Sequence, residues 1–334
     1  MMGSLARLRR YLTFALCSTM FAVAIAQEPS WVLIPAFSTA FRVQDMLFAS
    51  ESDIYIAGRT DGVIHSGDRG ASWQQLTSGL GSADVVRIAR LPSGAVLAAA
   101  GGTGGVFRLQ SDGSWRRSDL QTPTTGLVIN RRNEAIAYSQ SVVYRSTDGD
   151  HFTRVVQVNT GIGQVLARAP NGDLWAGTEG SGVFRSTDDG NTWQNAGDKV
   201  NGSAFGFSAR GDVLYAERAA VWRYTGGTTW VHSDTGLPNS PRVFTFATNG
   251  AGQMFAGLSG GAVYVSDDNG QSWRRYSSGL PATFVVGALG IDPAGVLYAG
   301  GGERGGGLYR TSASTGGAQP PSKPPAPANL RIVH

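Results

Sequence analysis

The chain has almost no cysteine, and its single copy, Cys17, lies in an N-terminal segment that we expect to be removed. A mature chain without cysteine has no disulfide, no thiol nucleophile and no zinc site built from thiolates. Long apolar runs are missing too, because no later stretch approaches the roughly 20 apolar residues that cross a bilayer. We therefore predict no integral membrane segment after the leader is removed.

Residues 1–26 have the parts of a secretory signal peptide. Three arginines open the segment, an apolar run follows from 11 to 25, and Ala24-Ile25-Ala26 has the small residues of a cleavage site. Phe14-Ala15-Leu16 before Cys17 is a poor lipoprotein cleavage motif. We predict cleavage near Ala26 and a secreted or periplasmic bacterial protein.

Neither sign of charge dominates the mature chain. The sequence has 28 Lys and Arg against 24 Asp and Glu, and the leader removes three arginines and no acid, which leaves 25 against 24. Binding to a phosphate backbone requires clustered cations. We therefore expect no nucleic-acid partner.

The chain is instead rich in a repeat of about 40 residues. A recurring aromatic residue is spaced by 42, 42, 37, 41, 37 and 43 residues, at Trp31, Trp73, Trp115, Phe152, Trp193, Trp230 and Trp273. Between these aromatics lie short runs rich in Val, Tyr and Phe, bounded by Gly, Asp, Asn and Ser, which is typical of strands joined by tight turns. No segment shows a helical period of 3.6. Each period therefore predicts four antiparallel strands.

The order of the strands predicts how the repeats close. Seven sets of three strands and seven aromatic strands are out of phase, because Trp31 has no set before it and the last set has no aromatic after it. The N-terminal strand at 30–35 would complete the last blade and leave no open edge. We predict an all-β, seven-bladed β-propeller over 27–312, followed at 313–334 by a Pro-rich linker that ends like the start of a truncated fibronectin type III domain.

A second motif ends the third strand of several repeats. The pattern Ser-x-Asp-x-Gly-x-x-Trp occurs at 66–73, 186–193 and 266–273, and a copy one residue shorter occupies 146–152. Its residues are Ser66, Asp68, Gly70, Trp73, Ser146, Asp148, Ser186, Asp188, Gly190, Trp193, Ser266, Asp268, Gly270 and Trp273. The chain thereby resembles the Asp-box, or bacterial neuraminidase repeat, propellers, a group that includes sialidases, xyloglucan-type glycoside hydrolases and the photosystem II assembly factors.

We interpret the Asp-box as scaffold. Asp and Ser side chains accept hydrogen bonds from nearby backbone amides, Gly190 permits positive φ, and Trp193 is expected to bury its ring between blades. The resemblance places this turn between the third and fourth strands, on the side away from a ligand. The box lacks the alternating ligands of a calcium loop, and the four histidines form no spaced pair, so we predict no metal and no cofactor.

Candidate site residues fall on the opposite turns, which surround the central channel of a propeller. These ligand-face candidates are Arg42, Arg59, Asp61, Asp84, Glu179, Glu217, Arg218, Arg242, Glu303 and Arg304. We expect the face to bind a protein or a glycan without catalysis.

Two alternatives remain open. Phe41-Arg42 in "FRVQD" resembles the start of the Phe/Tyr-Arg-Ile-Pro motif of sialidases, so a glycoside hydrolase of the exo-α-sialidase type would draw on Arg42, Glu179, Glu217 and Glu303. The short connecting turns offer little material to enclose a sugar. The third hypothesis is an assembly factor for a membrane complex, which would present an arginine-rich patch.

Overall fold

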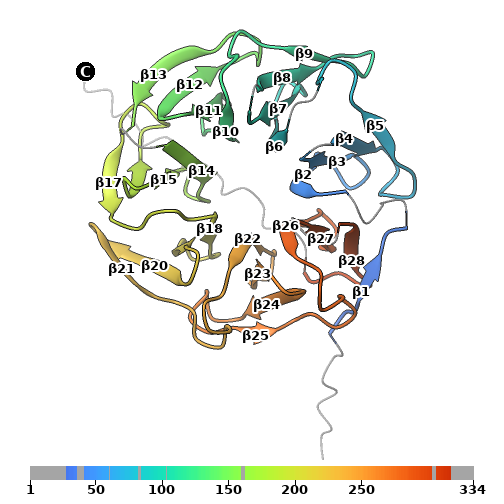
Figure 1. The fold of residues 1–334 in the computed structure, drawn as a ribbon, viewed down its shortest axis with the longest axis vertical. Coiled ribbons are helices and arrows are strands. Elements are labelled where there is room, and N and C mark those ends of the chain that lie inside the picture. The colour runs from blue at the N-terminus through green and yellow to red at the C-terminus, as the bar shows by residue number, and fades with distance from the viewer. Residues whose placement is uncertain are drawn as a thin grey trace, which may run out of the picture.

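The computed structural model describes residues 28–35, 41–59, 61–81, 84–102, 104–158, 162–302 and 306–316. Within these ranges the regular structure forms seven four-stranded antiparallel sheets, arranged as blades around a central channel (Figure 1). The predicted seven-bladed all-β propeller is confirmed. The leader (1–26) and the tail from residue 317 onward lie outside the described residues.

Each blade runs outward from an innermost strand at the channel to an outer strand at the rim of the ring. In the order of blades 1 to 7, the innermost strands are β2 (Val43–Phe48), β6 (Val85–Arg90), β10 (Thr124–Ile129), β14 (Ile162–Arg168), β18 (Ala204–Phe207), β22 (Val243–Thr248) and β26 (Val286–Ile291). The second strands are β3 (Ile54–Gly58), β7 (Val96–Ala100), β11 (Ala135–Ser139), β15 (Leu174–Glu179), β19 (Val213–Ala216), β23 (Met254–Leu258) and β27 (Leu297–Gly301). The third strands are β4 (Gly62–Ser66), β8 (Gly105–Leu109), β12 (Val142–Ser146), β16 (Val183–Ser186), β20 (Val221–Gly226), β24 (Ala262–Ser266) and β28 (Leu308–Thr311). The outer strands are β5 (Gln74–Leu76), β9 (Trp115–Arg117), β13 (Thr153–Gln157), β17 (Gln194–Gly197), β21 (Thr229–His232), β25 (Arg274–Arg275) and β1 (Trp31–Leu33).

The N-terminal strand closes the ring, as the strand order predicts. Strand β1 is the outer strand of blade 7 and pairs with β28, with Trp31 opposite Thr311 (Figure 1). The Trp31 amide also donates to the Ser278 carbonyl of blade 6, at 2.8 Å. Joining the two ends of the chain in one sheet removes the exposed edges that an open blade would present.

Seven apolar clusters among the described residues form the core, one between each pair of neighbouring blades. The second strands of blades 1, 2, 3, 5, 6 and 7 are buried at every position, because a blade on each side covers both of their faces. This burial explains why they read as continuous runs of apolar and small residues rather than as an alternation. Each fully buried Leu, Ile or Phe contributes about 1.5–3 kcal/mol.

The Asp-box turns join the third strand of a blade to its outer strand. In blade 4, Ser186 Oγ accepts from the Gly190 amide at 2.9 Å and donates to Asp188 Oδ1 at 2.8 Å. Asp188 also accepts from the Thr192 amide at 2.9 Å and the Thr192 hydroxyl at 2.7 Å. Asp189 (φ 62°) and Gly190 (φ 90°) occupy the left-handed region that such a tight turn requires.

The other boxes repeat this network. Hydrogen bonds from Ser72 and Ser66 lower the pKa of Asp68 to about 2. In the shortened copy of blade 3, His151 replaces the hydroxyl residue, and its Nδ1 lies 2.8 Å from Asp148 Oδ2. The imidazole therefore supplies the bond that Ser or Thr supplies elsewhere.

The tryptophans that end the repeats differ in how their indoles are bonded. Four buried indoles donate to a carbonyl of the preceding blade: Trp31, Trp115, Trp230 and Trp273. Trp193 is half-buried, and its indole donates to the Gly190 carbonyl within its own box at 3.2 Å. Its ring also packs against the apolar cluster between blades 3 and 4, so it contacts both blades as expected but makes no hydrogen bond between them.

Candidate functional site

Two faces of the ring differ in their turns. We call the side of the Asp-box turns the box face. The mouth face is the other side, formed by the turns between second and third strands and by the connections that lead into the innermost strands. Arg59 and Asp61 lie in the first kind of turn, and Arg42, Asp84 and Arg242 lie directly before an innermost strand.

The innermost strands are bulged near the mouth face. The pairing of first and second strands shifts by one residue in blades 1, 2, 3, 4, 6 and 7. A bulge re-aims the side chains that follow it. In blades 1 and 2 the residues after the bulge are Asp45 and Arg87, and both line a cavity in the channel.

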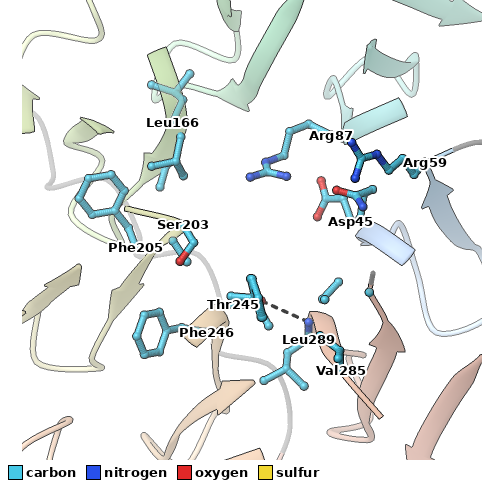
Figure 2. Close-up of a pocket in the computed structure, with 18 residues that line it drawn as sticks. Asp45, Arg59, Arg87, Leu166, Ser203, Phe205, Thr245, Phe246, Val285 and Leu289 are labelled. Carbon is cyan, nitrogen blue, oxygen red and sulfur yellow. Dashed lines mark hydrogen bonds between the residues drawn. The ribbon is translucent and has the colours of Figure 1, made fainter. Parts of the chain in front are cut away.

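This upper cavity has a volume of about 350 Å³ and two unlike walls. Figure 2 shows Asp45, Arg59 and Arg87 on one side of it, and Leu166, Phe205 and Phe246 from blades 4, 5 and 6 on the other. Ser203 lies beside Phe205, and Thr245 lies between Phe246 and Leu289 (Figure 2). The cavity is therefore charged on one side and apolar on the other.

Asp45 joins blade 1 to blade 2. Its Oδ2 accepts from the Ile88 amide at 2.9 Å, and its Oδ1 accepts from the Met46 amide at 3.0 Å. Burial raises the pKa of Asp45, against the opposing attraction of Arg87 and these two backbone bonds. Thr245 occupies the same place in blade 6, where its hydroxyl accepts from the Leu289 amide at 3.2 Å.

Arg87 extends its guanidinium into the cavity (Figure 2). Its Nη1 donates to the Val86 carbonyl at 2.6 Å. It forms no ion pair within 4.0 Å among the described residues, so the electrostatic attraction between Arg87 and the carboxylate of Asp45 acts over a longer distance. The remaining guanidinium donors face the cavity.

Arg59 and Asp84 form an ion pair at the rim, with 3.4 Å between Nε and Oδ2. Burial raises the pKa of Asp84, while Arg59 opposes the rise. Asp84 Oδ1 is buried without a hydrogen-bond partner among the described residues.

A second pocket of about 510 Å³ lies on the mouth face between blades 5 and 6, and we call it the rim pocket. It is lined by Glu217, Arg218, Arg242 and Phe244, so three of the residues predicted from the sequence meet here. Glu217 is held by two donors, the Val200 amide at 2.8 Å and the indole of Trp222 at 2.6 Å. Its carboxylate therefore has a structural role in shaping the pocket.

The other predicted residues are not brought together. Arg42 and Glu179 are exposed in blades 1 and 4, and Asp61 lies in the β3–β4 turn. Glu303 and Arg304 lie outside the described residues. Sequence reasoning missed Asp45 and Arg87, although the repeat could have pointed to them as the only charged residues two positions after the start of an innermost strand.

Below the upper cavity the channel is more apolar. A lower cavity of about 540 Å³ shares Phe205 and Phe246 with the upper one and opens toward the box face. Arg90 and Arg168 line it among apolar side chains. Burial lowers the pKa of Arg168, and the nearby charge of Arg131 adds to this effect.

The chemistry of these cavities gives little support to hydrolysis. Among the described residues, Asp45 is the only carboxylate that lines the upper cavity and Glu217 the only one that lines the rim pocket. Most glycosidases use two carboxyl groups across one bond, whereas sialidases pair a tyrosine nucleophile with an acid. Among the described residues, no tyrosine lines either cavity. No group of three or more His, Cys, Asp or Glu in the described part of the chain could hold a metal ion. No helix in the same part has the length and apolarity to cross a membrane.

Comparisons with known proteins identify similar chains. No family model matches. The chain is 24% identical over 301 residues to the photosystem II assembly lipoprotein Ycf48 of Synechococcus sp. (strain CC9902), across 85% of this chain and 89% of the relative. A structure of Ycf48 bound to D1 peptide has a TM-score of 0.69 at 16% identity, across 86% of this chain and all (100%) of that one. Virginiamycin B lyase from Staphylococcus aureus has a TM-score of 0.70 at 10% identity, across 84% and 97% of the two chains. At these identities the structures share the fold, which occurs in a lyase and in an assembly factor.

Proposed function

We propose that the chain is a non-catalytic, extracytoplasmic Asp-box propeller that binds an acidic segment of a protein partner on its mouth face. The leader at 1–26 would export it, and the tail at 313–334 would act as a linker. The similarity to an assembly lipoprotein, and to a propeller structure that holds a peptide, supports this class of function.

The rim pocket carries the proposal. Arg218 and Arg242 are exposed, line the same pocket and form no ion pair among the described residues. The Arg242 guanidinium lies 5.3 Å from the centroid of the Phe244 ring, which holds it at the edge of the pocket. Because Glu217 is occupied by its two donors, it leaves these arginines available.

Such a pair suits carboxylates of a partner. A planar guanidinium binds a carboxylate through two parallel N–H donors, and it loses less hydration than an ammonium does. Arg42, which is also exposed, adds a further arginine to the mouth face at blade 1. Apolar residues of the partner segment would contact Phe244.

The test measures binding of a fluorescent 12-residue peptide of alternating Glu and Leu, with the Gln/Leu peptide as control. The Arg218→Gln/Arg242→Gln double variant should weaken binding at least tenfold, or about 1.4 kcal/mol. Arg275→Gln, an exposed arginine on outer strand β25, is the matched control and should bind normally.

Three results would contradict the proposal. Equal binding of the two peptides would show that the carboxylates of the peptide do not contribute to binding. A preference for a neutral glycan would indicate carbohydrate recognition. Turnover of a sialoside or polysaccharide that is lost in Glu217→Gln or Arg42→Ala would establish the hydrolase alternative.

A further inference from the structure

Asp45 has more hydrogen-bonding capacity than its link between blades 1 and 2 uses. Thr245 shows that a single neutral hydroxyl suffices to bond one blade to the next at this position. Asp45 makes the same bond to Ile88 but adds a charge that faces the upper cavity. A carboxylate has about four acceptor positions, and the described residues take two of them.

Arg87 places a second charge beside it. Asp45 and Arg87 occupy the same post-bulge position in neighbouring blades, and both point into the cavity (Figure 2). They are more than 4.0 Å apart at their charged atoms, so neither satisfies the other directly. Asp45 and Arg87 are both partly buried, and removing a charge from water is costly unless the charge is paired and hydrogen-bonded. Two opposite charges with a gap between them suit a ligand that carries an ammonium and a carboxylate on the same carbon atom.

The opposite wall defines the rest of such a ligand. Leu166 and Phe205 are buried at 3% and 7% exposure, and Phe246 lies beside them. A volume of about 350 Å³ lies at the lower end of the range for small-molecule sites. Apolar surface opposite paired charges is complementary to an amphipathic zwitterion.

We propose that the upper cavity binds a free apolar α-amino acid, with its carboxylate at Arg87, its ammonium at Asp45 and its side chain against Leu166, Phe205 and Phe246. This site lies inside the channel and shares Ser203 and Phe244 with the rim pocket, but Asp45 and Arg87, which carry the proposal, do not line that pocket. It therefore does not rest on the proposed peptide binding.

Calorimetry on the whole chain with three ligands tests each charge without mutation. L-Phenylalanine carries both charges, 3-phenylpropionate lacks the ammonium, and phenethylamine lacks the carboxylate. We expect L-phenylalanine to bind with a dissociation constant on the order of 0.1–1 mM, and each of the other two to bind at least tenfold more weakly. Absence of phenylalanine binding at 10 mM, roughly ten times the upper expected constant, or equal binding of all three, would overturn the proposal.

Two variants, each lacking one of the two charges, should change which of the three ligands binds more tightly. Asp45→Thr keeps an acceptor for Ile88, as in blade 6, and removes the negative charge. It should weaken the binding of phenylalanine about tenfold and strengthen the binding of 3-phenylpropionate relative to the wild type. Arg87→Gln should weaken the binding of phenylalanine by a similar factor and strengthen the binding of phenethylamine relative to the wild type.

Arg275→Gln serves as the charge-matched control and should leave all three affinities unchanged. Thermal unfolding establishes that each variant is folded before its affinities are compared. If the two channel variants fold and keep the wild-type order of affinities, the ligand is not held by these charges and the proposal is wrong. If either fails to fold, the three-ligand comparison on the wild type still decides.

Discussion

Replacing Asp188 with alanine should destabilise the propeller without touching the mouth face. The change removes the acceptor for three hydrogen bonds, from the Ser186 hydroxyl and from the amide and hydroxyl of Thr192. A hydrogen bond to a charged group contributes about 1.5–3 kcal/mol, but water can replace part of this at a half-exposed site. We expect a loss of ~2–3 kcal/mol in the free energy of unfolding, and Asp188→Asn should cost ~1 kcal/mol because the amide oxygen still accepts.

The loss is measured by urea and thermal unfolding. At roughly 2–4 °C per kcal/mol for a large domain, Asp188→Ala should lower Tm by roughly 5–10 °C. Asp198→Ala is the control in the same blade, because its side chain is 89% exposed and, within the described part of the chain, forms an ion pair only with Lys199 at 3.5 Å. This control should change stability by less than ~0.5 kcal/mol.

The effect of pH provides an independent check. Partial burial alone would raise the pKa of Asp188, but hydrogen bonds from Thr192 and Ser186 lower it below its ordinary value of 3.8. The folded chain thus binds this proton less tightly than the unfolded chain. The contribution of ionised Asp188 to the free energy of unfolding is complete above pH 3.8 and is lost as the pH falls toward the folded pKa. The reasoning is refuted if Asp188→Ala matches the Asp198→Ala control, or if the folded variant loses peptide binding.

The same logic extends to other sites. The hydrogen bond to Asp148 raises the pKa of His151 above 6.5, so the stabilising effect of this bond is present below pH 6.5 and is lost as the pH rises through the folded pKa. Between pH 5.5 and 9, roughly the span over which a raised histidine pKa titrates, the Tm of the wild type should therefore fall more than the Tm of His151→Gln. Parallel curves of Tm against pH would contradict this. Glu217→Ala should cost ~2 kcal/mol in urea unfolding, because two donors lose a charged acceptor; an unchanged midpoint would show that the two bonds contribute nothing. Trp273→Phe should cost ~1–2 kcal/mol and Trp193→Phe less than ~1 kcal/mol, because only the first indole bonds to another blade; the reverse order would refute the distinction.

The sequence located the scaffold better than the site. Repeated Ser-x-Asp-x-Gly residues form local contacts within one turn, so the role of Asp188 follows from its own neighbours. The role of Glu217 does not, because its partners Val200 and Trp222 approach from other segments. Trp193 and Trp273 stand in identical motifs but bond to different carbonyls.

By itself the sequence determined the seven-bladed ring and its closure by residues 30–35, because strand periodicity and the count of strands depend only on order along the chain. Only the tertiary structure brought Asp45 and Arg87 into one cavity opposite Phe205 and Phe246. These residues lie in four blades, and each innermost strand contributes only a few side chains to the channel. Their meeting depends on bulges that re-aim side chains and on the curvature of the closed ring, and neither is encoded by a local pattern.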